Sequence, residues 1–242
     1  MYVLYCRHMQ HFFVNEDFGK GPVTIRDDEI LHQLIKVLRF RVGDELVLLD
    51  GKGGRAAGKI EELHKEAAKI KIEKLEHCEK PGREVRLYAA ISKKPETFEL
   101  IVQKATELGA TMITPLFCAR CQVESVRKPE RLKKIIKEAA EQAERIFLPE
   151  MGEVLKLEEL IKNLPEGKFL AGDARDYDKK LGEMDFDGSQ NLVIGPEGGL
   201  TDEEILKVRE AGGIIFSMNE NVLRMETAAI AALAIVQAKC LR

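Results

Sequence analysis

A glycine-rich loop that contains one acidic residue is the first candidate for a binding site. Residues 194–199 read Ile-Gly-Pro-Glu-Gly-Gly and lie between a short apolar run and a helix-capping sequence at 201–204. Glycines let a backbone approach a ligand closely, but Glu197 would repel a phosphate, and the loop lacks the P-loop lysine and the dinucleotide glycine spacing. The loop therefore suits a neutral or partly cationic ligand such as a sulfonium, unless it is only a tight turn.

A second candidate places two charged residues beside a strongly apolar helix. Residues 218–228 read Met-Asn-Glu-Asn-Val-Leu-Arg-Met-Glu-Thr-Ala and lead into a helix predicted over 225–239, which is apolar nearly all round. Arg224 and Glu226 beside a buried helix are unfavourable unless they are paired or used in chemistry. A mutual ion pair and a role in a site therefore remain equally open.

Two other segments are candidates for contact with an anionic partner. A basic amphipathic stretch contains Lys36 and Arg39, with Arg41 close behind, and its basic edge is either solvated or meets phosphates. Gln142 and Arg145 are predicted one turn apart on a single helix, so they share a face. A surface pair is the simpler interpretation of that spacing.

Cysteines and histidines form no recognisable catalytic or metal-binding pattern. The five cysteines are odd in number and scattered, which argues against a disulfide framework and fits reduced thiols in a cytosolic protein. Cys118 and Cys121 form a C-x-x-C pair, but no second pair or nearby histidine completes a zinc site. The pair follows an apolar segment, as a redox motif would, although two incidental thiols are the favoured interpretation.

The composition indicates a globular protein of one large or two small domains. Of 242 residues, 45% are hydrophobic and 33% are charged, which supplies a core and excludes disorder as the default state. The longest unbroken apolar run, residues 228–236, is far shorter than the about 20 residues that a membrane span needs. The formal net charge of −3 excludes a bulk polycation that coats nucleic acid, but a local patch can still bind RNA.

The predicted elements change character near residue 80, at a hinge formed by residues 79–82. Before it, strand-like runs at 42–50 and 69–73, a turn at 51–54 and one helix at 28–39 predict a small β-barrel. After it, strands and helices alternate, which predicts a mainly parallel sheet covered on both faces. The predicted strands are 85–91, 112–117, 168–172, 192–195 and 214–218, and the predicted helices are 95–108, 132–147, 201–211 and 225–239.

Taken in order along the chain, these motifs resemble the RsmE-type small-subunit ribosomal RNA methyltransferases of the SPOUT superfamily. Seven segments carry the resemblance, which covers nearly the whole chain from Met9 onward: residues 11–14, 37–44, 50–53, 103–115, 138–145, 194–199 and 223–228. Each segment is a weak signal alone, whereas their common order is highly specific.

The resemblance implies an α/β fold in which residues 81–242 form a parallel sheet with a deep trefoil knot, preceded by a PUA-like, RNA-binding β-barrel at 1–80. It implies methylation of N3 of one uridine in 16S ribosomal RNA of the small ribosomal subunit, with S-adenosylmethionine as cofactor. It also implies a cytoplasmic homodimer that uses no metal and no membrane. The alternatives are a non-catalytic dimeric RNA-binding module and a superfamily methyltransferase that acts on another RNA, such as transfer RNA.

The resemblance also assigns roles to single residues. Arg224 or Arg145 would stabilise charge that develops on the uracil oxygens, with Glu197 or Glu226 as the orienting or proton-accepting partner. The expected RNA contacts are Lys36, Arg39, Arg41, Gln142 and Arg145, of which the last two would face the active site. The expected cofactor contacts are Leu170, Gly172, Ile194, Gly195, Pro196, Glu197, Gly198, Gly199, Met218, Asn219, Val222, Leu223 and Thr227. The chain departs from the family at Met218-Asn219, where Leu-Gly is usual, although asparagine tolerates left-handed backbone angles better than most residues.

Overall fold

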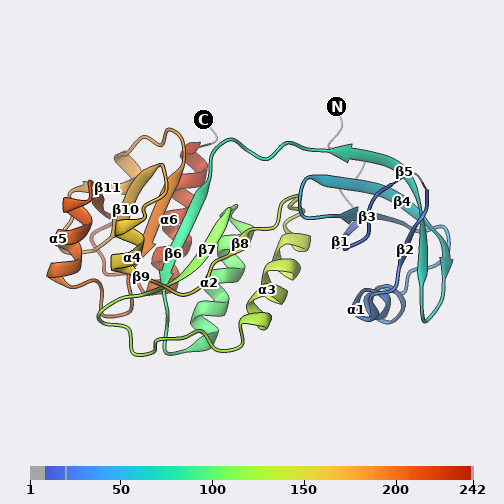
Figure 1. Ribbon diagram of the computed structural model, residues 1–242, viewed down its shortest axis with the longest axis horizontal. Helices are drawn as coiled ribbons and strands as arrows, with labels where there is room; N and C mark the ends of the chain where they lie inside the picture. Colours follow the sequence, from blue (N-terminus) through green and yellow to red (C-terminus); the bar gives the residue numbers. More distant parts are fainter. Residues whose placement is uncertain (1–8, 20, 241–242) are drawn as a thin grey trace. The chain divides into compact units, whose positions relative to one another are not determined.

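The chain folds into two compact units, which are drawn with their element labels in Figure 1. The structure, a computed structural model, describes residues 9–19 and 21–240. Unit 1 contains the described residues up to Lys80 together with Ala140–Leu148. Unit 2 contains Pro81–Ala139 and the described residues from Pro149 onward. The sequence-based division at residue 80 did not anticipate that a second segment, Ala140–Leu148, belongs with unit 1.

Unit 1 is built on a curled five-stranded sheet. Its strand order is β1-β3-β4-β5-β2, in which β1 and β3 are parallel and the other pairs are antiparallel. The strands are β1 (Gln10–Phe13), β2 (Val23–Ile25), β3 (Glu45–Leu49), β4 (Gly54–Leu63) and β5 (Ala68–His77). Two shifts of register between β4 and β5 add twist and bend to this pair. The predicted small β-domain is therefore present as a curled sheet.

The core of unit 1 explains why a distant segment joins it. Ala140 is fully buried in an apolar cluster with Phe13, Val47 and Leu49, which lie on strands β1 and β3. The backbone amide of Phe13 also donates a hydrogen bond to the Glu141 carboxylate, at 2.9 Å. Burial of small apolar residues against a sheet is the usual way in which an added segment is fixed to a core.

The helix of unit 1 is shorter and less regular than predicted. It begins as α1 (Asp28–His32), where the Asp27 side chain accepts the first free backbone amides, and continues as a π-helical segment, η1 (Gln33–Val37). Arg39, inside the predicted helix, instead has a left-handed φ of 56°. A non-glycine residue in this conformation terminates a helix, so the predicted helix over 28–39 ends two residues early.

Unit 2 contains a wholly parallel sheet, as the alternation of strands and helices predicted. Its strand order is β11-β13-β10-β12-β6-β7-β8, and β9 pairs with the end of β7. The strands are β6 (Val85–Ala90), β7 (Met112–Phe117), β8 (Glu150–Met151), β9 (Leu155–Lys156), β10 (Lys168–Gly172), β11 (Lys179–Lys180), β12 (Gln190–Ile194) and β13 (Ile214–Ser217). The trefoil knot stays a prediction.

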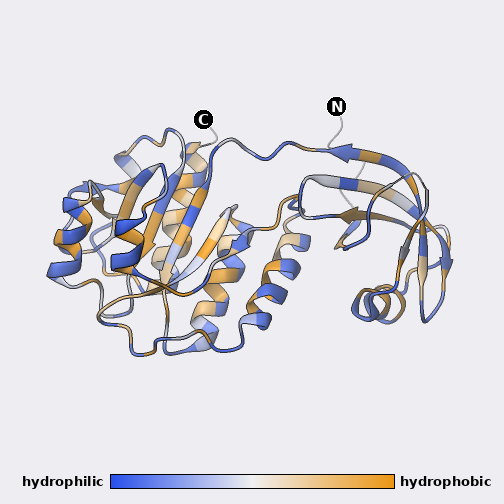
Figure 2. Cartoon of the chain, in the orientation of Figure 1, coloured by the Kyte–Doolittle hydropathy of each residue, from blue (hydrophilic) through white to orange (hydrophobic). Residues whose placement is uncertain are grey.

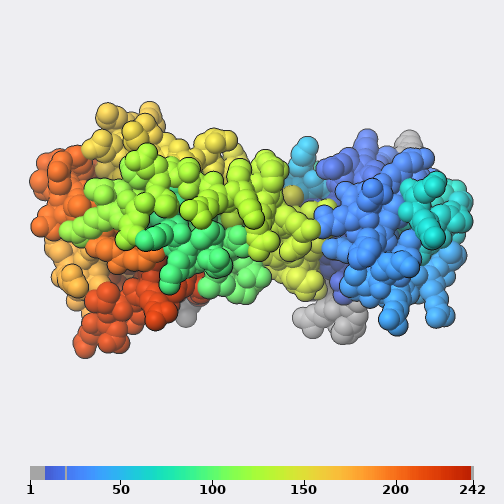
Figure 3. Space-filling model, turned by 90° about the horizontal axis from the view of Figure 1, so that it is seen from below, coloured from blue at the N-terminus to red at the C-terminus, as the bar shows by residue number. Residues whose placement is uncertain are grey.

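Helices pack onto the two sides of this sheet. They are α2 (Pro95–Glu107), α4 (Leu157–Lys162), the short 3₁₀ helix η2 (Leu181–Glu183), α5 (Asp202–Glu210) and α6 (Met225–Cys240). Helix α2 packs against α6, and α4 packs against α5. Figure 3 shows α4 (yellow) and α6 (red) on opposite sides of unit 2. No helix within the described ranges is long and apolar enough to cross a membrane.

Helix α3 (Pro129–Gln142) ends five residues before its predicted end at 147. Figure 2 shows hydrophobic and hydrophilic residues alternating along it, as an amphipathic helix requires. It stops because Glu144 has a φ of 53°, and the amides of Glu144 and Arg145 donate to the carbonyls of Glu141 and Ala140, which is a Schellman cap. The prediction that Gln142 and Arg145 share a helical face is therefore wrong, since Arg145 lies beyond the cap.

Candidate active site

A pocket of about 720 Å³ opens in unit 2 where three parallel strands end. Gly172, Ile194 and Ser217 are the last residues of β10, β12 and β13, and each of them lines the pocket. Ligands of parallel sheets bind beyond the carboxyl ends of the strands, and a volume in the range of roughly 300–1,000 Å³ suits a small molecule. The position and the size of this pocket make it the candidate active site.

Most of the residues predicted to bind the cofactor line this pocket. They are Gly172, Ile194, Gly195, Pro196, Glu197, Gly198, Gly199, Met218, Asn219, Val222 and Leu223, and they are joined by Arg224 and Glu226. Leu170 and Thr227 are not among the lining residues: Leu170 is fully buried inside β10, and Thr227 is exposed on the first turn of α6. The individual roles of these residues stay predictions.

The glycine loop at 195–199 is held in place by an arginine from the turn that follows β7. The Arg120 guanidinium donates hydrogen bonds to the carbonyls of Gly198 and Leu200, at 2.8 and 2.9 Å. Gly199 has a φ of 72°, a conformation that side chains disfavour, so a glycine is required there. The loop is therefore fixed both by its own backbone geometry and by a side chain 78 residues away in the sequence.

The carboxylate of Glu204 joins the loop that follows β7 to the start of α5. It is buried and accepts hydrogen bonds from the backbone amides of Ala119 and Thr201, each at 2.8 Å. The Thr201 hydroxyl in turn accepts from the Glu204 amide, which completes the capping box that the sequence predicted. A single buried side chain thus fixes both the helix that closes the glycine loop and the neighbouring turn.

Ser92, which follows β6, holds the acidic residue of the glycine loop. Its hydroxyl is buried, donates to a Glu197 carboxylate oxygen at 2.6 Å, and accepts from the Lys94 amide at 3.2 Å. Glu197 itself is exposed at the pocket. A hydrogen bond to an ionised carboxylate is among the stronger ones in proteins, so Ser92 orients the Glu197 side chain.

Within the described residues, the hydrogen bonds of the segment at 218–224 join near neighbours. The Ser217 hydroxyl donates to the carbonyl of Asn219, and the Asn219 side chain accepts from the amide of Asn221 at 3.0 Å. Asn219 does not have the left-handed backbone that its type would tolerate; it forms a local turn instead. Arg224 and Glu226 form no ion pair with each other in the described part of the chain, so their mutual pairing does not explain them.

A third wall of the pocket consists of the loop after β10. The Asp173 carboxylate accepts from the amides of Arg175 and Asp176, at 2.8 and 2.9 Å. Arg209 of α5 forms ion pairs with Asp176 and Asp178, and its hydrogen bonds lower the pKa of Asp176. These contacts hold the loop against α5, so this wall also has a fixed position.

The remaining predicted residues belong to unit 1. Lys36, Arg39, Arg41 and Gln142 are exposed there, and Arg145 is half-buried. Burial lowers the pKa of Arg145 to about 10, so its guanidinium stays charged at neutral pH. None of these side chains lines the pocket of unit 2.

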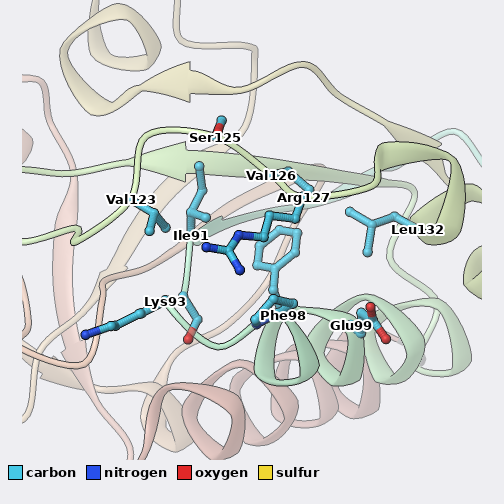
Figure 4. A pocket seen from close by; sticks show the side chains of 11 residues that line it. Ile91, Lys93, Phe98, Glu99, Val123, Ser125, Val126, Arg127 and Leu132 are labelled. Atoms are coloured by element: carbon cyan, nitrogen blue, oxygen red, sulfur yellow. The ribbon is translucent and has the colours of Figure 1, made fainter.

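A second, much smaller cavity of about 20 Å³ is lined in part by Ser92. Figure 4 shows Ile91, Phe98, Val126 and Leu132 around it, which makes its interior largely apolar. Its volume admits about one water molecule, which excludes it as a site for a nucleobase. No group of three or more metal-ligating side chains is present among the residues that the structure describes.

Sequence analysis missed Ser92 and Arg120 as residues of this site. Both follow strands, β6 and β7, whose carboxyl ends lie at the same edge of the sheet as the pocket. The rule that polar residues after neighbouring parallel strands converge was the available signal. The contacts themselves join residues 105 and 78 positions apart, so no local pattern in the sequence reveals them.

Two family models match this chain. An RNA methyltransferase domain matches residues 78–237, and an RNA methyltransferase PUA domain matches residues 25–73. The first match covers unit 2 and more than half of the chain. The second covers most of the strands of the curled sheet in unit 1.

Named relatives match over nearly the full length. The ribosomal RNA small subunit methyltransferase E of Rickettsia conorii is 30% identical, over 93% of each chain. The protein of that name from Synechocystis is 35% identical, over 92% of this chain and 75% of its own. A crystal structure of the Neisseria gonorrhoeae enzyme bound to S-adenosylmethionine is 29% identical, with a TM-score of 0.86 over 96% of this chain and 98% of that one.

A Legionella pneumophila methyltransferase in complex with the same cofactor is also 29% identical, with a TM-score of 0.84 over 95% of this chain and 97% of that one. The order of motifs, the parallel sheet with a pocket at its strand ends, and these matches agree with one another. The chain belongs to the RNA methyltransferase family of the ribosomal RNA small subunit methyltransferase E type.

Proposed function

We propose that unit 2 transfers a methyl group from S-adenosylmethionine to N3 of a uridine in 16S ribosomal RNA of the small ribosomal subunit. The observation that carries the proposal is the pocket at the ends of β10, β12 and β13, walled by the glycine loop and by the segment at 218–224. Two relatives with the same fold over nearly their full length are crystallised with this cofactor.

The chemistry of the pocket suits that cofactor. Acidic side chains that line it include Asp173, Asp176, Glu197 and Glu226, which attract a sulfonium and repel phosphates. Apolar groups for an adenine ring come from Ile194, Phe216, Met218, Val222 and Leu223. Arg120, one of the basic residues there, is turned toward loop carbonyls. When bound, the cofactor supplies the methyl group on its sulfonium.

The protein must hold the uracil in line and help its N3 proton to leave. Correct positioning of the two reactants alone can lower the activation barrier of methyl transfer by on the order of 7 kcal/mol. As the proton leaves, negative charge develops on the uracil oxygens, and the Arg224 guanidinium at the pocket is the group to stabilise it. Glu197, oriented by Ser92, is the proton acceptor, with Glu226 as the alternative, and Arg145 of unit 1 is a second candidate for charge stabilisation.

The proposal is tested by incubating small ribosomal subunits that lack the modification with the protein and labelled S-adenosylmethionine. Nucleoside mass spectrometry should find a single N3-methyluridine in 16S RNA. Transfer to a different RNA would favour a superfamily methyltransferase of other specificity. Cofactor-independent RNA binding with no transfer would favour a non-catalytic module.

Substitution of the two arginines tests the assigned roles. Arg224→Ala should lower turnover about 100-fold, because it removes a group aimed at developing charge. Arg175→Ala is the matched control, since Arg175 lines the same pocket and is exposed. Full turnover of both Arg224→Ala and Arg145→Ala would overturn the assignment.

We also infer that unit 1 binds RNA through Lys36, Arg39 and Arg41 in the cytoplasm. All three side chains are exposed, and they follow one another around the end of the helix. The triple alanine variant should weaken binding to small subunits and reduce its salt dependence, because about three phosphate contacts are lost. Lys65→Ala, an exposed lysine between β4 and β5, is the control. An unchanged salt dependence of binding would exclude this surface as the RNA-binding site.

A homodimer is the third part of the proposal. Helix α6 carries almost no polar face, and its Ile230, Ala231 and Ala234 are only half-buried. Apolar residues left partly exposed in this way are typical of a subunit interface. Light scattering should give twice the mass of 27.3 kDa for the full chain. A monomer at micromolar concentration would contradict the inference.

A further inference from the structure

A pair of cysteines flanks Arg120, the residue that binds the glycine loop, in a turn that the proposed reaction does not use. Residues 118–121, Cys-Ala-Arg-Cys, follow β7, and the Cys121 amide donates to the Cys118 carbonyl at 2.9 Å. This bond closes a four-residue β-turn, which holds its first and last α-carbons within about 7 Å. A disulfide usually joins α-carbons about 4.4–6.8 Å apart, so the backbone is already close to the required geometry.

The Cys121 sulfur lies against the backbone of Cys118 in the reduced protein. The Cys118 amide donates to the Cys121 sulfur at 3.3 Å, and the Cys121 thiol lies 3.8 Å from the Leu116 carbonyl, to which it donates. Interaction with the neighbouring thiol lowers the pKa of Cys121 to about 7 and raises the pKa of Cys118. Cys121 is half-buried and Cys118 is buried. The pair therefore contains one ionisable, reachable thiol next to one sheltered thiol.

The two residues between the cysteines connect this turn to the glycine loop and to the start of α5. Ala119 donates its amide to the buried Glu204 carboxylate, and Arg120 donates to the carbonyls of Gly198 and Leu200. A change in the turn must therefore pass to the wall of the pocket. The other described cysteines, Cys78 in unit 1 and Cys240 at the end of α6, have no such connection.

We propose that Cys118 and Cys121 are an oxidation site: a hydroperoxide converts them to a disulfide, which disturbs the contacts of Arg120 and weakens binding of S-adenosylmethionine. The two sulfurs must approach to about 2.05 Å to form the bond, which breaks the bond from the Cys118 amide to the Cys121 thiol and requires Ala119 and Arg120 to shift. The formation of the disulfide is independent of the proposed function. Only the second half, the loss of cofactor affinity, rests on it.

The chemistry balances with hydrogen peroxide as the oxidant. The Cys121 thiolate attacks one peroxide oxygen, the O–O bond breaks, and the departing hydroxide takes up the proton of the former thiol to leave as water, which gives a sulfenic acid. The Cys118 sulfur then attacks the Cys121 sulfur, the S–O bond breaks, and the hydroxyl leaves as a second water with the Cys118 proton. Two thiols are oxidised by two electrons, and one peroxide is reduced to two waters.

The test uses the full-length protein treated with stoichiometric hydrogen peroxide, followed by alkylation of free thiols and peptide mass spectrometry. We expect a peptide in which Cys118 and Cys121 are joined, in the wild type and in the Cys78→Ser/Cys240→Ser control. Cys118→Ser should stop at the sulfenic acid of Cys121, and Cys121→Ser should not react at Cys118. Overoxidation of Cys121 without a disulfide in the wild type would overturn the proposal.

Calorimetric titration with S-adenosylmethionine then tests the coupling. The oxidised wild type should bind about tenfold more weakly than the reduced form, with full recovery after dithiothreitol, because two hydrogen bonds from a charged group are disturbed. Equal affinity of an oxidised and a reduced sample, with the disulfide verified, would show that the turn does not act on the pocket. Failure of the reduced protein to bind the cofactor would instead contradict the proposed function and leave the disulfide result standing.

Discussion

The glycine loop at 195–199 and the segment at 218–224 line the same pocket after strands of the same sheet, yet they are held in different ways. The glycine loop is bound by side chains from distant positions: Ser92 on Glu197, and Arg120 on two carbonyls. Among the residues that the structure describes, the hydrogen bonds of the segment at 218–224 span two or four residues. One wall is fixed by the tertiary fold, whereas the other depends on local turns.

The difference indicates which wall changes when a ligand binds. Segments with exposed backbone and few long-range contacts unfold locally at a low cost in free energy. Ligand-binding loops commonly belong to this class. Val222, on the local wall, has 67% of its surface exposed, whereas Leu200, next to the glycine loop, is buried. We therefore expect the glycine loop to be preformed and the segment at 218–224 to become ordered around the cofactor.

Removal of the buried carboxylate beneath the glycine loop is expected to have the largest effect on stability. Glu204→Ala removes the acceptor of the part-buried amides of Ala119 and Thr201, at about 0.5–1.5 kcal/mol for each hydrogen bond. Urea denaturation should show this loss of unfolding free energy. Glu203→Ala, which removes an exposed neighbour that pairs with Lys207, should change the free energy of unfolding by less than about 0.5 kcal/mol. Equal effects of both variants would mean that the hydrogen bonds from Ala119 and Thr201 to Glu204 do not stabilise the fold.

Arg120→Ala breaks the preformed wall with little change in overall stability, because the side chain is at the surface. It removes both hydrogen bonds to the loop carbonyls, so the dissociation constant of S-adenosylmethionine should rise about tenfold. Calorimetry with Arg175→Ala as the control separates this effect from a general loss of positive charge at the pocket. If Arg120→Ala bound S-adenosylmethionine with wild-type affinity, the cofactor would have to bind at a place other than this pocket.

Ser92→Ala tests whether the fixed wall orients a reacting group. The variant frees the Glu197 carboxylate, so kcat should fall about tenfold while KM for the cofactor stays within twofold. Ser92→Thr keeps a hydroxyl and should recover much of the rate. A fall in cofactor affinity with unchanged kcat would instead make Ser92 a purely structural residue.

The local wall should respond less to a single substitution. Asn219→Ala removes one side-chain hydrogen bond to the exposed Asn221 amide, which is worth roughly 0.5 kcal/mol, or about twofold in KM for the cofactor. Steady-state kinetics measures it, with Asn221→Ala as the matched control. A rise in KM for the cofactor as large as the tenfold change expected for Arg120→Ala would mean that the two walls are not held differently.

The smallest expected effect concerns pH and the third wall. The ion pair with Arg209 holds the pKa of Asp176 below its usual value. The stability that this pair adds to the folded protein is therefore present above about pH 4 and is lost as pH falls below that. Arg209→Gln should therefore show a weaker decline in melting temperature between about pH 5 and pH 3 than the wild type. Identical pH profiles would mean that the pair does not stabilise the loop.

Local signals in the sequence were sufficient for the elements and for much of the pocket. The capping box at Thr201 and Glu204, and Pro95 at the start of α2, lie where the structure has helix ends. The glycine spacing and the strand-end rule also identified the residues at 194–199.

Other features depended on tertiary contacts and were not predictable. The end of α3 at Gln142 depends on Glu144 in a left-handed conformation, for which a glycine would have been the usual signal. The two-residue strands β8, β9 and β11 carry no pattern of their own. The hydrogen bonds from Ser92 and Arg120 join positions that are far apart in the sequence and meet only in the folded protein.

Hydrogen exchange of the full-length protein, with and without S-adenosylmethionine, tests the central claim that this pocket holds the cofactor between one preformed and one adaptable wall. We predict that amides at 218–224 exchange rapidly in the free protein and become protected by the cofactor, while those at 195–200 are already protected and slow further only slightly. Exchange at 36–41 should not change. Protection by the cofactor at neither wall, or at another surface alone, would contradict the account.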